Sequence, residues 1–136
     1  MPGLTDEQLD REFDIAHRTV RATFVHIIGN VEAWFDLMAG QPIRANQGRS
    51  VSELIARLDR AANDLARVSK IVAQRDGWVD PLEIPPIERT YGGSIAHVIT
   101  HSMHHWAQLL YMLRLLGVEE LPEGDVLSWE HQTGTA

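Results

Sequence analysis

The chain has 136 residues, of which 44% are hydrophobic and 23% are charged, with a formal net charge of −7 and no cysteine. This length and composition predict one globular domain over 1–136. Scattered basic residues in an acidic chain argue against electrostatic binding of nucleic acid. The absence of cysteine excludes disulfides, thiolate zinc sites and a cysteine nucleophile, so any thiol chemistry would have to come from a small molecule.

The first residues, MPGLTDEQLD, are acidic and lack the apolar run of a signal peptide. No stretch approaches the roughly 18 consecutive apolar residues that a membrane span needs. We therefore expect a cytoplasmic protein without a membrane partner.

Two helices are predicted in the first part of the chain. A short helix over 5–11 begins with the capping-box pair Thr5 and Gln8. After a connection, apolar side chains at three- and four-residue steps predict a long helix over 19–39. Gly40 is typical of the residue that ends such a helix.

A third helix is predicted over 50–73, where Ser50 and Glu53 form a second capping box. Its opposite face carries charged side chains, Arg57 among them, which we expect to be solvated. The buried stripe is expected to consist of Leu54, Leu58, Ala61, Ala62, Leu65 and Val68.

Residues 75–93 are rich in proline and glycine and predict a long extended connection. Ser94 is expected to cap a last long helix over 94–116. The tail follows, and its Trp129 is expected to dock on the body. With three long helices, a short N-terminal helix, an extended C-terminal tail and no strand pattern, the sequence predicts an all-α helical bundle.

Four of the seven histidines lie close together in the last predicted helix: His97, His101, His104 and His105. Residues four apart share a helix face, so His97 with His101, or His101 with His105, can bind one ion. His97 and His105 are about 12 Å apart along the axis, so this helix supplies only two ligands. Four histidines among apolar neighbours favour a divalent-metal site over solvated histidines. Spacing does not choose between the two pairs.

The third ligand must come from another helix, and His26 is the best candidate. Smaller side chains on its helix face, such as Asn30, leave room for a site. The alternative is a core histidine bonded to a backbone carbonyl. His17 falls in the connection and would lie about 180° round a continued helix, so we leave it out. His131 is expected at the surface, and Glu32 is expected to be a solvated surface residue rather than a base.

Two segments resemble the DinB family of four-helix metalloproteins: 19–38 (TVRATFVHIIGNVEAWFDLM) and 94–117 (SIAHVITHSMHHWAQLLYMLRLLG). The first resembles the family motif LAHIxxxExxW, which implies His26 as a metal ligand. The second resembles HxxNHxxxHRGQ, which implies His101 and His105 as the other two. The resemblance thereby selects between the two pairs. It also suggests a group of residues that flank the ligands or line the cavity, namely His97, His104, Asn30 and Gln108.

The chain departs from the family pattern in two places. Trp106 and Ala107 stand where the motif has arginine and glycine. The sequence from Leu4 onward resembles the connection between the family's first and second helices, so we expect the long first helix to be absent. An apolar groove left uncovered would favour a homodimer.

The resemblance also implies a function. Three histidines leave a coordination position open, as in catalytic zinc sites, and the family resembles enzymes that use mycothiol or bacillithiol. This implies a metal-dependent thiol S-transferase, or a hydrolase, that acts on a small molecule in stress or detoxification. The alternative is a non-catalytic, metal-stabilised bundle of the stress response. Zinc, nickel and iron(II) all suit such a site, and Trp78, Glu88 and Tyr91 of the long connection are candidates to line its entrance.

Overall fold

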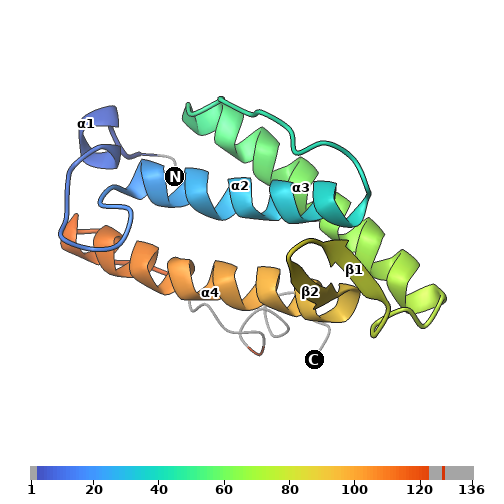
Figure 1. The fold of residues 1–136 in the computed structure, drawn as a ribbon. Coiled ribbons are helices and arrows are strands. Elements are labelled where there is room, and N and C mark those ends of the chain that lie inside the picture. Colours follow the sequence, from blue (N-terminus) through green and yellow to red (C-terminus); the bar gives the residue numbers. More distant parts are fainter. Residues whose placement is uncertain (1–2, 123–126, 128–136) are drawn as a thin grey trace.

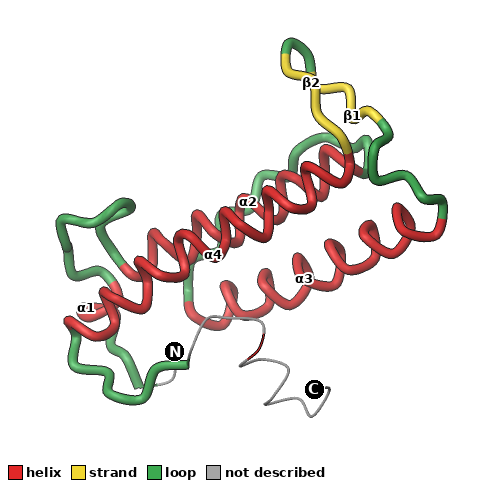
Figure 2. The backbone as a smooth tube through the Cα atoms, turned by 90° about the horizontal axis from the view of Figure 1, so that it is seen from below, coloured by secondary structure: helices red, strands yellow, loops and turns green. Residues whose placement is uncertain are grey.

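The structure is a computed structural model that describes residues 3–122 and 127. Three long helices dominate the described chain, and α2 is the central one: α3 packs along one side of it and α4 along another (Figures 1 and 2). The predicted helical bundle with a short N-terminal helix is therefore confirmed. In chain order the elements are α1 (Asp6–Leu9), α2 (Val20–Met38), α3 (Val51–Gln74), β1 (Pro81–Ile84), β2 (Ile87–Thr90) and α4 (Tyr91–Leu115).

Both predicted capping boxes are present. The Thr5 side chain accepts a hydrogen bond from the Gln8 backbone N–H at the start of α1. The Ser50 hydroxyl does the same for Glu53 at the start of α3, and the Glu53 carboxylate accepts from the Ser50 backbone N–H. Each box satisfies two backbone donors that a helix start would otherwise leave unpaired, which fixes where these helices begin.

The segment between α3 and α4 differs from the prediction. It is not an extended connection throughout, because β1 and β2 pair as an antiparallel hairpin in which Ile84 lies opposite Ile87. Strands of four residues that contain or flank prolines have no clear alternation, so the pattern was missed. Gly92 is required beyond the hairpin, because a Cβ there would lie 2.6 Å from the Trp78 carbonyl oxygen.

The last long helix begins earlier than predicted, at Tyr91. Its N-cap is Thr90, whose hydroxyl accepts from the Gly93 N–H at 3.0 Å. Ser94, the expected cap, lies inside the helix with its hydroxyl donating to the Thr90 carbonyl at 2.8 Å. The helix is therefore almost one turn longer than predicted. It begins at the residue that directly follows the hairpin.

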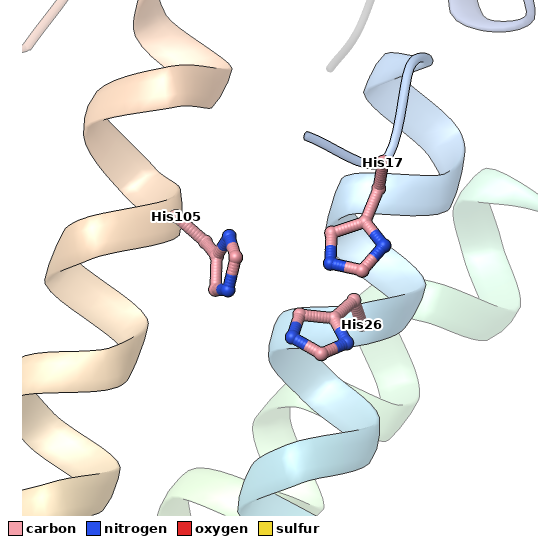
Figure 3. Close-up of side chains that lie close together, drawn as sticks. All are labelled: His17, His26 and His105. Atoms are coloured by element: carbon pink, nitrogen blue, oxygen red, sulfur yellow. The ribbon is translucent and has the colours of Figure 1, made fainter. Parts of the chain in front are cut away.

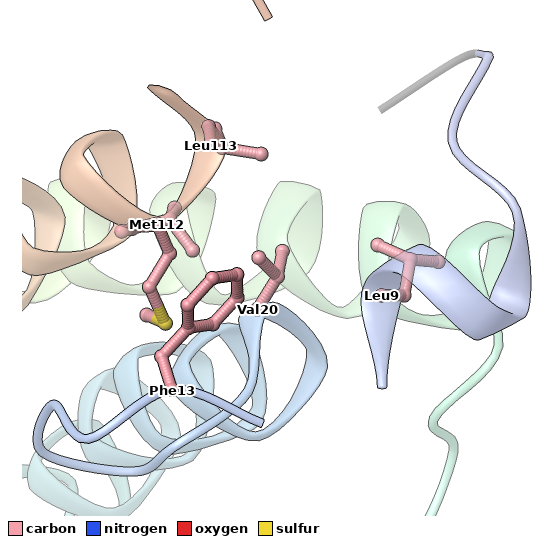
Figure 4. Close-up of a cluster of buried hydrophobic side chains, with 6 residues drawn as sticks. Leu9, Phe13, Val20, Met112 and Leu113 are labelled. Atoms are coloured by element: carbon pink, nitrogen blue, oxygen red, sulfur yellow. The ribbon is translucent and has the colours of Figure 1, made fainter. Parts of the chain in front are cut away.

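The core is divided along the α2–α4 interface. One buried cluster joins α1 and the following turn to the start of α2 and the end of α4, and it consists of Leu9, Phe13, Val20, Leu109, Met112 and Leu113 (Figure 4). A second lies towards the hairpin and consists of Phe35, Met38, Val68, Val72, Leu82 and Ile95. Burying each such side chain contributes about 1.5–3 kcal/mol. His26 and His105 fall between these clusters along their helices, so apolar packing fixes the helices on both sides of them.

The prediction that Arg57 and Glu32 are solvated is wrong. Each is only 3% exposed. The Arg57 guanidinium donates to the Glu32 carboxylate between α3 and α2, with a shortest nitrogen–oxygen distance of 2.5 Å, and also to the Gly48 carbonyl at 2.7 Å. The buried face of α3 therefore passes through Arg57 instead of Leu58, whose side chain is exposed.

The predicted docking of Trp129 and the predicted exposure of His131 concern residues outside the described part of the chain. Among the helices that the structure describes, none has the length and hydropathy needed to cross a membrane.

Candidate metal centre

Three histidines from two antiparallel helices meet in the middle of the α2–α4 interface. His26 comes from α2, and His101 and His105 come from successive turns of α4. Their ring centroids are 4.9 Å apart for His26 and His101, and 4.5 Å apart for both His26 with His105 and His101 with His105. The rings of the three residues that the sequence suggested as ligands are therefore neighbours, but the set of described histidines whose nitrogens all lie within 4.8 Å of one another contains His17 in place of His101.

The contact between His26 and His101 has the spacing of two ligands on one ion. Their Nε2 atoms lie 3.1 Å apart. Two nitrogens bound to one ion at ~2.1 Å each, at an angle between about 90° and 109°, are about 3.0 to 3.4 Å apart. The other ring nitrogen of His101, Nδ1, is buried and has no hydrogen-bond partner among the described residues. The same 3.1 Å separation is also that of a hydrogen bond in which one Nε2 donates to the other.

The His105 ring is fixed by its neighbour on the next turn of α4. The Nδ1 N–H donates to the Gln108 Oε1 atom, which lies 2.7 Å away. An amide oxygen can only accept, so this contact places the proton on Nδ1 and leaves the Nε2 lone pair free. A hydrogen bond of this kind commonly orients metal-binding histidines. Gln108 therefore contacts the cluster where the sequence suggested a flanking residue.

A fourth histidine, His17, was missed by the sequence reasoning. Its ring stacks on His26 with 3.9 Å between centroids and lies 5.1 Å from His105. Nitrogen atoms of His17, His26 and His105 all lie within 4.8 Å of one another, a geometry that could hold a metal ion (Figure 3). Helical arithmetic put His17 on the far side of α2, but the chain reverses direction before Thr19, where α2 is capped.

The remaining flanking residues lie at different distances from this cluster. Asn30 is one helical turn beyond His26, and its Nδ2 group is buried with no hydrogen-bond partner among the described residues. His104 is exposed, with its ring 4.9 Å from His105. His97 is also exposed and lies 5.5 Å from His101 and 5.3 Å from the Trp34 ring. Asn30 is therefore the flanking polar group that lies inside the interface.

Burial favours the neutral form of three of the clustered imidazoles. Burial first, and then the nearby rings of His17, His105 and His101, together lower the pKa of His26 from 6.5 to about 4. Burial, followed by the His105 ring, also lowers the pKa of both His17 and His101. A neutral imidazole is the form that binds metal, so protons compete weakly for these nitrogens at pH 7.

The donor set fits a divalent transition-metal ion. Neutral imidazole nitrogens are ligands for zinc, nickel and iron(II). Among the described residues, the ring nitrogen of this cluster that is buried without a hydrogen-bond partner is Nδ1 of His101, and such a group is costly unless something binds it. The Nε2 atoms of His26 and His101 contact each other, and Gln108 already accepts from Nδ1 of His105.

A cleft of about 1120 Å³ opens beside the hairpin, and its lining includes His97, whose ring lies 5.5 Å from that of His101. Of the residues expected at an entrance, Glu88 lines this cleft. Its other contributors include Trp34, Leu82, Ile84, Arg89 and Thr90. The cleft thus combines an apolar floor with a few charged groups, as small-molecule sites do.

These features define a helical bundle with a histidine-built site between two antiparallel helices. The family model for the DinB family matches residues 2–134, nearly the whole chain. The protein therefore belongs to the DinB family. No curated protein matches the chain with significance.

Proposed function

We propose that this DinB-family protein binds one divalent metal ion through His26, His101 and His105. The observation that carries the proposal is the convergence of imidazole nitrogens from α2 and α4, above all the 3.1 Å separation of the His26 and His101 Nε2 atoms. The sequence supports this choice, because the spacing of the histidines in α4 predicts two ligands from one helix and a third from another. Zinc, nickel and iron(II) are all suitable ions, and supply as well as geometry decides between them.

We further propose that the centre serves a metal-dependent thiol S-transferase that acts on small electrophilic molecules. A bound divalent ion would supply the Lewis acidity that keeps a thiol deprotonated at neutral pH. The protein has no cysteine, so the thiol would be a low-molecular-weight cosubstrate of the mycothiol or bacillithiol type. The family resemblance of the metal motifs supports this choice.

The protein's own groups would bind and orient the reactants. Gln108 holds the His105 ring, and the buried Asn30 Nδ2 group is a free donor within the same interface. The cleft beside the hairpin can bind the electrophile, with Trp34 and His97 between it and the cluster. A donor without a protein partner is well suited to bind a group that the substrate brings.

The test uses protein loaded with cobalt(II), whose visible spectrum reports the ligands of the ion. Candidate thiols are added first, and a chlorinated aromatic electrophile is added second. We expect the spectrum to change with the thiol and the conjugate to form only when metal is present. Tyr111→Ala is the matched control, because it removes an exposed aromatic ring of the same helix. If no thiol changes the spectrum and no conjugate forms, the transferase proposal is wrong, and a non-catalytic metal-stabilised bundle is the better description.

We also propose that the protein acts in the cytoplasm as a homodimer. Support for the dimer comes from exposed apolar side chains on one face of α3: Ile55 and Leu58 are 58% and 44% exposed. They lie one turn apart, at the rim of a small apolar hollow between α2 and α3. Paired apolar residues of this kind mark interaction surfaces more often than isolated ones do.

A further inference from the structure

The turn before α2 is closed by backbone hydrogen bonds. The Phe13 N–H donates to the Arg18 carbonyl at 2.7 Å, and the Arg18 N–H donates to the Ile15 carbonyl at 2.7 Å. The Thr19 N–H donates to the His17 carbonyl at 2.9 Å, immediately before the helix begins. These three bonds give the segment from Phe13 to Thr19 a defined shape.

That shape is strained on both sides of His17. Ala16 has a φ of 38° and Arg18 has a φ of 73°, and neither is glycine. The left-handed region is unfavourable for an L-residue that carries a Cβ. Ala16 and Arg18 are exposed, whereas His17 between them is partly buried against His26. The strain therefore has one visible consequence, which is to turn His17 towards the histidine cluster. Strain of this kind collects at functional sites.

The turn is also anchored to the bundle at its two ends. Phe13 is buried in the same cluster as Val20 and Met112. Arg21, on the first turn of α2, pairs with Asp6 at 2.6 Å and with Asp10 at 2.7 Å. The N-terminal segment is thus fixed on either side of the strained residues, and the position of the His17 ring follows from these contacts.

We infer that His17 is a fourth ligand of the metal, so that ion binding fastens the N-terminal turn to α2 and α4. The inference rests on the metal centre proposed above. Its geometric basis is that nitrogens of His17, His26 and His105 lie within 4.8 Å of one another. The Nε2 atom of His101 lies 3.1 Å from the Nε2 atom of His26. In this arrangement His17 would be the one ligand that no helix carries.

The first experiment measures zinc affinity by competition with a chromogenic chelator. His17→Ala removes the ring, and His17→Phe keeps a ring that can stack on His26 but has no nitrogen. We expect both variants to bind zinc at least about ten-fold more weakly than the wild-type protein, since even the loss of an outer contact to a ligand costs about 10–100-fold. Tyr111→Ala, which removes an exposed ring from α4, is expected to keep wild-type affinity. The cobalt(II) spectrum should change in both His17 variants and remain unchanged in Tyr111→Ala.

The second experiment follows trypsin cleavage after Arg18, which is exposed at the strained turn. Cleavage requires the turn to open locally. In the wild-type protein, saturating zinc should slow cleavage at this bond at least about ten-fold, because opening would break the bond to His17. In His17→Ala and His17→Phe, zinc should have no effect on the rate, even at concentrations that saturate the weaker site.

The outcomes separate the two proposals. If wild-type protein binds no divalent ion, the metal centre is wrong and the role of His17 falls with it. If wild-type protein binds zinc and both His17 variants bind it equally tightly, with the same cobalt spectrum, only the inference about His17 is overturned. If His17→Phe behaves as the wild-type protein and His17→Ala does not, His17 acts by stacking, and the inference is likewise overturned.

Discussion

The His105 Nδ1 atom lies 2.7 Å from the Gln108 Oε1 atom, one turn further along α4. This hydrogen bond selects the nitrogen that remains free to bind an ion. Gln108→Leu should weaken zinc binding by about 10–100-fold, because the ring loses its orientation. Gln108→Glu should retain affinity, since a carboxylate accepts the same proton. Chelator competition measures both. Equal affinity of the leucine variant and the wild-type protein would show that Gln108 does not position His105.

The buried pair of Arg57 and Glu32 predicts a large effect on stability. Arg57→Ala should lower the free energy of unfolding by about 3–5 kcal/mol, because it leaves the Glu32 carboxylate buried without its partner. The double variant Arg57→Met with Glu32→Leu should recover most of that loss, because it leaves no buried charge. Urea unfolding of the metal-free proteins measures each value. A loss below 1 kcal/mol in Arg57→Ala would mean that water reaches this pair.

The lowered pKa of His26 predicts how the stability of metal-free protein depends on pH. Burial, and then the neighbouring rings, hold this pKa at about 4 in the folded state, against 6.5 for an ordinary histidine. The unfolded chain therefore binds more protons between these two values. Stability should be complete above about pH 6.5 and should decline as the pH falls towards 4. His26→Phe should flatten the decline, as measured by urea unfolding at each pH in the presence of a chelator.

The Asp36 carboxyl also contributes to a pH-dependent stability, but it does so in a lower pH range than His26. Hydrogen bonds from Arg44 lower the pKa of the buried Asp36 carboxyl to about 2. Its contribution is present above the ordinary value of 3.8 and is lost as the pH falls through 2. A decline that begins near pH 6.5 therefore comes from the histidines. If His26→Phe and wild-type protein decline alike from that pH, the His26 ring is not the group responsible.

The exposed apolar face of α3 predicts the effect of a charge on assembly. Leu58→Glu should convert a homodimer into a monomer without lowering the free energy of unfolding of the monomer, because this side chain is 44% exposed. Sedimentation velocity over a range of concentrations measures the change. Asp59→Ala, on the same helix, is the matched control and should remain dimeric. A wild-type protein that sediments as a monomer at every concentration would contradict the proposed dimer.

Much of the helical frame could be predicted because its signals are local. The Thr5 and Ser50 capping boxes marked two helix starts within one residue. Gly40 and Gly117, with φ of 70° and 89°, stand just beyond the ends of α2 and α4. Glycine usually marks the residue that follows a helix in the left-handed region, although Asp76, with a φ of 51°, takes that place after α3. Helix boundaries of this kind depend on a few neighbouring residues only.

The parts that escaped prediction depend on contacts between distant segments or on an unfavourable backbone. The burial of Arg57 depends on Glu32 of another helix, and a periodicity analysis assigns charged residues to the solvated face. His17 comes near His26 through the strained residues Ala16 and Arg18, which have no local preference for a left-handed conformation. The histidine-rich segment of α4 was evident from spacing, but spacing did not choose between its overlapping pairs, and the choice of His101 with His105 came from the family resemblance.

The most direct test of the central claim is the metal content of the purified protein, measured by elemental analysis beside His26→Ala and His105→Ala. The two variants remove ligands from different helices. Loss of bound metal in both is therefore expected if the site lies between α2 and α4. We predict one divalent ion per chain in the wild-type protein and much less than one in each variant, with circular dichroism showing that both remain folded. Full metal content in both variants would contradict the proposed centre.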